Sequence, residues 1–289
     1  MTLPIGGNTS QISKVQPDRW SLDESRCGGG NFVCRDTICN LMDLQRIAAL
    51  LQPFLASPRR LPERLSSGES AVLTEPQLQQ ISTYLDLLLR WNSRINLTAI
   101  REPDEIVTRH FGESLFTAQH LFPSVLPARA QPLPAVQPGR ASARPRLFDF
   151  GSGAGFPGLP IKIWAPHVDL TLIESNQKKA TFLREVVRLL SLDSAAVFSG
   201  RAQNFSARAD VVTLRAVERF ENSVPIATAL VEPCGKLALL IGQAQVTHAR
   251  ELASTFQWQE PIPIPLSANR VLLIGLNNPV TNPVDQVSS

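Results

Sequence analysis

Long apolar runs are missing from this chain of 289 residues, whose mean hydropathy is −0.01. No stretch approaches the roughly 20 apolar residues that a membrane-spanning helix needs, so we expect no membrane segment. Residues 1–10 contain no apolar core of the kind found in a secretory signal, so we expect no such signal. Internal repeats are also absent. Hydrophobic residues make up 43% of the chain, which is enough for a substantial folded core.

Cysteine and histidine are scarce, with 4 of each. Cys27, Cys34 and Cys39 fall close together, but their spacing matches no common zinc pattern and no histidine is near them. Free thiols and no metal are therefore expected. The remaining cysteine, Cys234, stands between a proline and a glycine, which predicts a structural position in a loop before a strand.

A strong excess of one charge sign is lacking as well. The formal net charge is +3 and the isoelectric point is about 8.8, which permits an anionic partner without requiring one. Basic residues that could meet phosphate occur along the expected helices. They are Arg90, Arg94, Arg101, Arg109, Lys178 and Lys179.

Composition and periodicity divide the chain into five parts. Residues 1–41 have no sustained periodicity and are predicted to be a disordered extension, with translation starting at or near Met42. Residues 42–122 are predicted to form a small helical region. Residues 123–145 are a proline- and arginine-rich insertion, residues 146–277 form the main domain, and residues 278–289 are a disordered tail.

Two helices are predicted in the N-terminal region. The run Thr74-Glu75-Pro76-Gln77 is typical of a helix start, because it combines a capping threonine, an early proline and a glutamine three residues on. Apolar residues then recur at helical spacing up to Trp91, and a second amphipathic helix is expected after Pro103. We expect the Trp91 ring to pack the helical region onto the main domain.

From Arg146 onward, strand patterns alternate with helical ones. Such alternation predicts an α/β fold with a mostly parallel sheet covered on both faces. The connection 243–268 before the last strand is longer and more polar than the others. The expected strands are 147–150, 169–173, 195–199, 209–214, 236–241 and 270–275.

The most informative stretch follows the first expected strand and runs Asp149-Phe150-Gly151-Ser152-Gly153-Ala154-Gly155-Phe156-Pro157-Gly158. A strand, a glycine-rich turn and a helix form the nucleotide-binding element of doubly wound folds. Its glycines match both G-x-G-x-G and the dinucleotide fingerprint G-x-G-x-x-G. Asp149 would accept hydrogen bonds from loop amides or face a cationic ligand. Pro157 and Pro160 remove amides that a pyrophosphate would use, so S-adenosylmethionine is favoured over a dinucleotide.

Glu174 ends the second expected strand. A carboxylate there can accept both hydroxyl hydrogens of a ribose, a role found in dehydrogenases and in methyltransferases alike. It therefore supports a nucleoside ligand without naming it. Two alternatives stay open at this point: an NAD(P)-dependent oxidoreductase, and a cofactor-binding regulatory protein without catalysis.

Three segments together carry a family resemblance: Trp91–Ile100 with its W-N-x-x-x-N-L-T pattern, Arg109-His110, and Asp149–Gly158. Over about residues 45–277 the sequence resembles bacterial small-subunit ribosomal RNA methyltransferase G, also called glucose-inhibited division protein B. The resemblance implies a Rossmann-like class I S-adenosylmethionine-dependent methyltransferase. Its sheet would be seven-stranded and mostly parallel with a C-terminal antiparallel strand, preceded by the small helical region.

The activity that the resemblance implies is methylation of guanine N7 in 16S rRNA, at the guanine-527 site of the decoding-region loop. The expected partner is 16S rRNA or the small ribosomal subunit, and the protein is expected to be a cytoplasmic monomer. Arg215 and Arg201 are expected to hold an RNA phosphate or the guanine edge, or to order the cofactor. The expected cofactor contacts are Gly151, Gly153, Gly155, Phe156, Glu174, Ala202, Gln203 and Arg215.

The chain departs from the family pattern at three positions. Gln203 stands where the family usually has a carboxylate, and Ile241 stands where it often has a lysine. Glu113 keeps the acid of the family's Leu-Asp-Ser segment but lengthens it. A neutral amide can still meet the edge of an adenine, so cofactor binding is expected to persist.

Overall fold

The computed structural model describes residues 42–56, 72–123, 144–216 and 219–278. The predicted extension 1–41, nearly all of the insertion 123–145 and nearly all of the tail 278–289 lie outside the described residues. Cys27, Cys34 and Cys39 lie outside them too, and so do the residues before Met42, on which the predicted translation start depends. Among the described helices, none has the length and apolar character needed to cross a bilayer.

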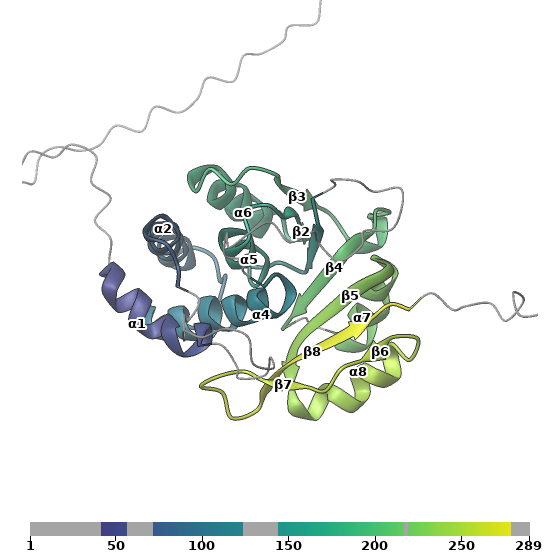
Figure 1. Cartoon of the computed structure of the whole chain (residues 1–289). Coiled ribbons are helices and arrows are strands. Elements are labelled where there is room, and N and C mark those ends of the chain that lie inside the picture. Colours follow the sequence, from purple (N-terminus) through teal and green to yellow (C-terminus); the bar gives the residue numbers. More distant parts are fainter. Residues whose placement is uncertain (1–41, 57–71, 124–143, 217–218, 279–289) are drawn as a thin grey trace, which may run out of the picture. The chain divides into compact units, whose positions relative to one another are not determined.

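One eight-stranded sheet is the centre of the fold, in the order β3-β2-β1-β4-β5-β8-β6 with β7 paired to β8 (Figure 1). Strands β1 to β5 pair in parallel, and β8 is antiparallel to β5. The strands are β1 (Arg146–Phe150), β2 (Asp169–Glu174), β3 (Ala195–Ser199), β4 (Ala209–Arg215), β5 (Val231–Gly242), β6 (Gln257–Trp258), β7 (Ile262–Pro263) and β8 (Arg270–Leu276).

The α/β class, the mostly parallel sheet and its C-terminal antiparallel strand are confirmed. The expected count of seven strands is wrong, because the polar connection 243–268 contributes the two-residue strands β6 and β7, which pair with β8. The loop expected around Cys234 is also wrong. Cys234 lies inside β5, which begins at Val231, although its φ of 64° interrupts the extended backbone and leaves the thiol exposed.

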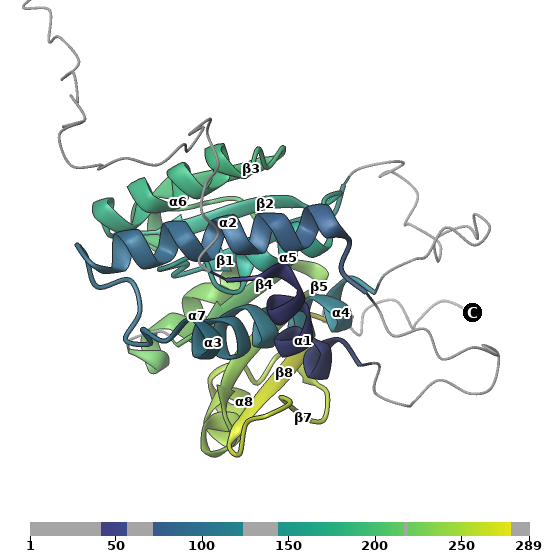
Figure 2. The same cartoon turned by 90° about the vertical axis from the view of Figure 1, so that its left-hand side faces the viewer.

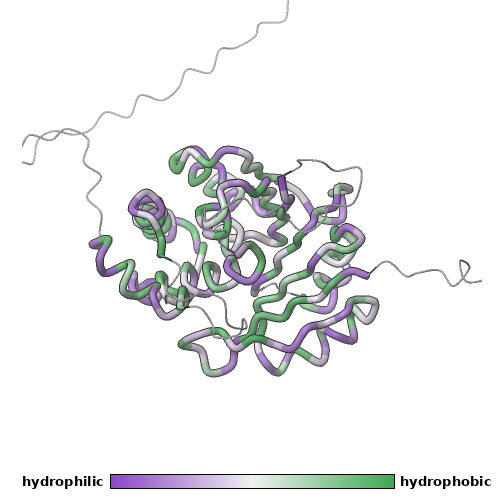
Figure 3. The backbone as a smooth tube through the Cα atoms, in the orientation of Figure 1, coloured by the Kyte–Doolittle hydropathy of each residue, from purple (hydrophilic) through white to green (hydrophobic). Residues whose placement is uncertain are grey.

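Alternation along the strands explains why helices cover both faces. Successive strand side chains point to opposite faces, so Leu147 of β1 enters one apolar cluster and Phe148 enters the other. Strands β4 and β5 are hydrophobic over most of their length (Figure 3). This continuous apolar character is typical of parallel strands that are buried on both sides.

One face of the sheet is covered by α5 (Gly158–Trp164) and α6 (Gln177–Leu189). The opposite face is covered by α7 (Phe220–Ala229) and α8 (Val246–Leu252) (Figure 1). Two short 3₁₀ turns, η2 (Ala202–Asn204) and η3 (Gln243–Gln245), follow β3 and β5.

The N-terminal helices lie on the same side of the sheet as α5 and α6, and their apolar residues join the same core cluster. They are α1 (Leu44–Leu55), α2 (Glu75–Asn92), α3 (Pro103–Ile106) and α4 (Glu113–Leu121), with the π-helical segment η1 (Val107–Gly112) between the last two. Both predicted helices are therefore present, and the second one contains a π turn. Figure 2 shows α2 lying over α5 and α6, and its apolar positions join the same core cluster.

Side chains of α2 tie the helical region to the sheet domain. The side-chain oxygen Oε1 of Gln77 accepts from the Thr74 backbone N–H at 2.9 Å, which caps α2. Its side-chain nitrogen Nε2 donates to the Ile163 carbonyl of α5, also at 2.9 Å. Trp91 Nε1 donates to Glu185 of α6 at 3.0 Å, and the Trp91 ring packs edge-on against Phe182. The packing role expected for Trp91 is confirmed.

The chain order around the sheet defines one switch point. From β1 the chain moves outward to β2 and β3, then returns to β4 on the other side of β1. Ligands of open α/β sheets bind at the carboxyl ends of the strands at such a point. The glycine-rich turn follows β1 and Arg215 ends β4, so both lie there.

Candidate functional site

The glycine-rich turn between β1 and α5 is a tight backbone loop. Gly151, Gly153 and Gly155 have φ values of 66°, 56° and 92°, a region that glycine adopts without steric cost. The backbone N–H groups of Gly151 and Ser152 donate to the Ile173 carbonyl of β2, at 2.9 and 3.1 Å. A methyl group on Gly153 would meet only the Gly151 carbonyl, at 3.7 Å, so the space above the middle of the loop is open.

Asp149 supports this loop from beneath. Its side chain is fully buried, and its oxygens accept from Thr213 Oγ1 at 2.8 Å and from the Gly158 backbone N–H at 3.2 Å. Burial raises the pKa of Asp149 to about 6, against the opposing effect of these hydrogen bonds. Of the two roles considered for Asp149, the structure shows the bond to an amide, here at the first residue of α5.

Glu174 connects the end of β2 to the same loop. One carboxylate oxygen accepts from the Gly153 backbone N–H at 2.8 Å, and the other accepts from the Asn176 N–H at 2.7 Å. The side chain is nearly buried. Its partners in the described residues thus fix the loop and the start of α6, and its expected contact to a ribose stays a prediction.

A hollow of about 480 Å³ lies beside the end of β1, and Gln203 is one of its walls. Ala202 is buried at the start of η2, whereas Gln203 and Arg201 are exposed. Ala202 and Gln203 thus follow β3 at the same edge as the glycine loop. The residues lining the hollow are Phe150, Gln203, Arg219, Glu221, Asn222, Ser223, Pro225 and Ile226.

Phe156, the aromatic residue of the glycine loop, stacks with two rings from the helical region. Tyr84 of α2 stacks with it at a ring-centroid distance of 5.4 Å, and His110 of η1 stacks with it at 4.8 Å. Phe111 meets Phe156 edge-on at 5.1 Å. The Tyr84 hydroxyl also donates to the Ala154 carbonyl. Tyr84 of α2 thus contacts both the Phe156 ring and the backbone of the glycine loop.

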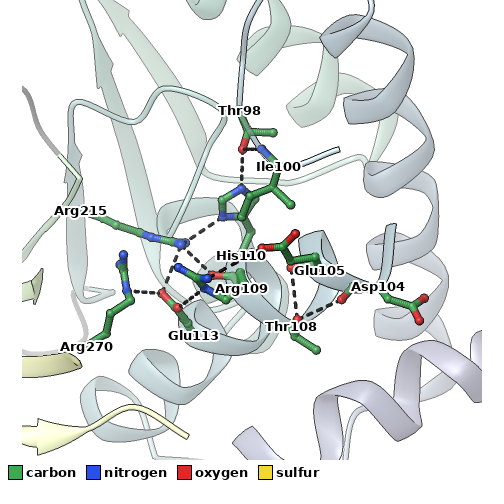
Figure 4. Close-up of polar contacts among 10 residues, drawn as sticks. All are labelled: Thr98, Ile100, Asp104, Glu105, Thr108, Arg109, His110, Glu113, Arg215 and Arg270. Atoms are coloured by element: carbon green, nitrogen blue, oxygen red, sulfur yellow. Dashed lines mark hydrogen bonds and ion pairs between the residues drawn. The ribbon is translucent and has the colours of Figure 1, made fainter. Parts of the chain in front are cut away.

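His110 links this stack to Arg215 (Figure 4). Burial, and then the neighbouring positive charges of which Arg215 is the largest, lower the pKa of His110 to about 3, so the ring is neutral at pH 7. Arginine has no acceptor, so Nδ1 of His110 accepts from Arg215 Nη2 at 3.1 Å and Nε2 donates to Thr98 Oγ1 at 2.7 Å. Thr98 closes the W-N-x-x-x-N-L-T segment, which explains why that segment matters to the site.

Arg215 belongs to a cluster of three guanidinium groups around one buried carboxylate (Figure 4). Glu113 of α4 is paired with Arg109 at 3.2 Å, with Arg215 at 3.2 Å and with Arg270 at 3.1 Å. Arg215 Nη2 also donates to the Arg109 carbonyl at 2.7 Å. Burial lowers the pKa of Arg215 to about 10, which leaves it cationic at pH 7.

The structure brings most of the predicted site together. The glycines, Phe156, Glu174 and Arg215 meet around the loop, while Arg201 and Gln203 are exposed after β3. Sequence reasoning missed Tyr84 and Arg270. Arg270 could have been found from topology, because the first residue of an antiparallel strand lies at the edge where parallel neighbours end. No group of three metal-binding side chains occurs in the described parts of the chain.

Comparison with known proteins gives this site a family context. The profile of the family described as GidB, rRNA small subunit methyltransferase G, matches residues 77–126 and 129–268. A protein called ribosomal RNA small subunit methyltransferase G from Stenotrophomonas maltophilia strain K279a is 36% identical over 237 residues, covering 81% of this chain and 96% of the relative. One of the same name from Streptococcus pyogenes serotype M2 is 35% identical over 187 residues, covering 63% of this chain and 72% of the relative.

Solved structures show weaker likeness. The P. horikoshii protein TYW2 in complex with MeSAdo has a TM-score of 0.40 at 16% identity, covering 46% of this chain and 56% of that one. The YcgJ protein from Bacillus subtilis has a TM-score of 0.43 at 11% identity, covering 59% of this chain and 100% of that one.

Proposed function

Because this chain belongs to the rRNA small subunit methyltransferase G family, we propose that it methylates N7 of guanine in 16S rRNA, at the guanine-527 site of the decoding-region loop. Membership of this family makes the chain an S-adenosylmethionine-dependent rRNA methyltransferase. The proposal adds the methylated atom, N7, and the methylated nucleotide, guanine 527. The proposal includes a cytoplasmic, monomeric enzyme that acts on 16S rRNA or on the small subunit.

The residues at the switch point fit the cofactor. The open space above Gly153 admits a ligand close to the backbone, and the hollow beside Gln203 has room for a nucleoside. We infer that Gly151, Gly153, Gly155 and Phe156 shape the binding surface, while Glu174 meets the ribose and Ala202 with Gln203 meets the adenine. When bound there, S-adenosylmethionine supplies the electrophilic methyl group.

Two titratable groups beside the loop, His110 and Asp149, support attack by N7. Guanine N7 carries an in-plane lone pair and no hydrogen, so no base has to remove a proton, whereas an exocyclic amine would need one. His110 has both ring nitrogens engaged, and Asp149 is enclosed beneath the loop and hydrogen-bonded. Neither is arranged to accept a substrate proton. This observation, added to family membership, carries the proposed choice of atom.

What the protein then has to do is hold the base in line with the reacting methyl. Alignment of this kind contributes up to roughly 7–11 kcal/mol to catalysis. We infer that Arg215, fixed by Glu113 and His110, orders the substrate or the cofactor at the end of β4. We also infer that Arg201, which is exposed after β3, meets the RNA.

The decisive experiment maps 7-methylguanine in 16S rRNA from a strain that lacks the gene. We expect one 7-methylguanine in the decoding-region loop to disappear and to return with the wild-type gene. Arg215→Ala should fail to restore it and should lower methyl transfer in vitro by about 100-fold, the scale expected when alignment is lost.

Arg188→Ala is the matched control, because Arg188 is exposed in the last turn of α6, away from the switch point. It should restore methylation fully. An unchanged methylation map in the deletion strain would remove the proposed function.

A further inference from the structure

The Glu113 cluster has more positive charge than its buried carboxylate balances. Arg215 and Arg270 both pair with the same Glu113 oxygen, at 3.2 and 3.1 Å, and Arg109 pairs with the other oxygen. Arg109 has a second acid, Glu105, at 3.8 Å on its exposed side. His110 is neutral and adds no charge of either sign. Arg215 and Arg270 therefore pair with one carboxylate between them, and the buried Asp149 adds a further negative charge that acts on Arg215.

Both arginines also have N–H groups without an acceptor. Within the described residues, Arg215 Nη1 and Arg270 Nη2 are buried and make no hydrogen bond, although Arg215 Nη2 makes two. Leaving a charged donor unsatisfied in a buried place costs free energy. An oxyanion between the two side chains would satisfy both donors and balance the remaining charge.

The sheet explains why two residues so far apart in the chain meet. Arg215 is the last residue of β4 and pairs with Leu240 of β5, while Arg270 is the first residue of β8 and pairs with Gly242 of β5. The antiparallel direction of β8 thus brings Arg270 to the edge where β4 ends. This is also the edge that contains the glycine loop.

The cluster reaches the surface on one side. The Arg215 and Glu113 side chains are 6% and 1% exposed, but that of Arg270 is 23% exposed and that of Arg109 is 42% exposed. A ligand can therefore approach from the side of Arg270 and Arg109. Guanidinium groups fixed in this way suit a phosphate, because their planar donors match its oxygens.

We propose that Arg270 and Arg215, held by Glu113, form a binding site for one phosphodiester group of the substrate RNA beside the target guanine. This inference rests on the proposed function, because it assumes that RNA is bound at this edge of the sheet. Arg270 fixes the position of the RNA strand. Glu113 is a positioning residue that orients both guanidinium groups. The cofactor's carboxylate is a second possible source of an oxyanion, and the test separates the two.

The test compares the full-length wild type with Arg270→Gln, using 16S rRNA from the deletion strain and saturating S-adenosylhomocysteine. We expect the substitution to weaken RNA binding about tenfold, the scale of a lost charge-assisted hydrogen bond. The slope of log affinity against log salt concentration should fall by about 0.7 to 1, since one phosphate contact is removed. Affinity for S-adenosylhomocysteine alone should stay unchanged.

Arg188→Gln removes one positive charge elsewhere and should bind RNA with the wild-type salt slope. Arg270→Lys keeps the charge but has no Nη2, so we expect a wild-type slope with severalfold weaker binding. This second variant also serves if Arg270→Gln does not fold, which thermal unfolding would show. Wild-type RNA affinity in Arg270→Lys would contradict the proposal.

Two other results would overturn it. One is an RNA affinity and salt slope in Arg270→Gln equal to those of Arg188→Gln. The other is a loss of S-adenosylhomocysteine binding with RNA binding retained, which would assign the site to the cofactor. If the wild type itself transfers no methyl group to 16S rRNA, the proposed function has failed. If it does and Arg270→Gln binds normally, only the phosphate site has failed.

Discussion

His110 joins two parts of the site with one neutral ring. Its face stacks on Phe156 of the glycine loop, and its Nδ1 accepts from Arg215. A protonated ring could not accept that hydrogen bond, and it would place a positive charge beside Arg215, Arg109 and Arg270. The arrangement of Arg215 therefore depends on His110 staying neutral.

We predict that His110 makes the folded protein sensitive to mild acid. Its pKa falls from 6.5 in the unfolded chain to about 3 in the folded state, so protonation favours unfolding. The stabilisation is complete above pH 6.5 and is lost as the pH falls toward 3. Between pH 7 and pH 5, the free energy of unfolding should fall by up to about 2 kcal/mol more in the wild type than in His110→Gln.

Urea unfolding at both pH values measures this difference directly. Glutamine is neutral throughout the range, so every other titrating group is common to the two proteins. Parallel pH profiles for wild type and His110→Gln would show that His110 is protonated in the folded state.

The glycine loop depends on α2 and α5 for its shape. Gly155 has a φ of 92°, and a methyl group there would overlap the Leu159 side chain of α5 and the Tyr84 hydroxyl of α2. Gly153 has a φ of 56°, which other residues adopt at modest cost, and a methyl group there meets nothing closer than 3.7 Å. Two glycines of one motif thus have different physical reasons to be glycine.

We predict that Gly155→Ala lowers the free energy of unfolding by about 2 to 4 kcal/mol, combining overpacking with backbone strain. Gly153→Ala, the matched control, should lower it by only about 1 kcal/mol. Both are measured by urea unfolding without cofactor, so that ligand contacts do not enter. Equal losses in the two variants would show that Tyr84 and Leu159 move aside.

Strands and helices were predictable to the extent that local pattern determines them. The expected strands match β1 to β4 and β8 in place, and β5 over its second half, because short apolar runs between helical patterns have few other solutions. The strands β6 and β7 are missed because two residues have no periodicity and pair only because β8 is beside them. The π turn of η1 likewise has no recognised sequence signal.

The residues of the candidate site likewise fall into those predictable from local sequence and those that depend on tertiary packing. Its glycines, Asp149 and Glu174 were found because strand-turn-helix chemistry is local in sequence. The contact of Tyr84 with Ala154 and the pairing of Arg270 with Glu113 were not found, since each depends on how distant elements pack. Arg215, His110 and Glu113 were all singled out through the family resemblance, but their contacts with one another were not predicted.

At the scale of the whole molecule, the helical region and the sheet domain share one core. Tyr84, Phe111 and Leu115 from the helices belong to the same apolar cluster as Leu159 and Phe182 from the sheet domain. Trp164 Nε1 adds a hydrogen bond to the Phe122 carbonyl at 3.0 Å. These two regions should therefore unfold together.

We predict that a cofactor analogue stabilises this whole unit. S-adenosylhomocysteine at 100 times its dissociation constant should raise the free energy of unfolding by about 2.7 kcal/mol, because it binds only the folded state. A single cooperative transition should be seen with and without it in thermal unfolding. NADH at the same concentration is the control and should change nothing. Stabilisation by NADH alone would restore the oxidoreductase alternative.

The contacts of Tyr84 and His110 with Phe156 also have a consequence for folding during synthesis. Residues 75–121 supply Tyr84 and His110, and they leave the ribosome before the loop that they hold. Until β1 and α5 follow, the apolar faces of α2 and α4 have no sheet domain to cover them. A nascent chain interrupted before residue 146 would thus expose apolar helix faces, and the proposed cofactor site, from the glycine loop to Arg215, is synthesised after the helices that support it.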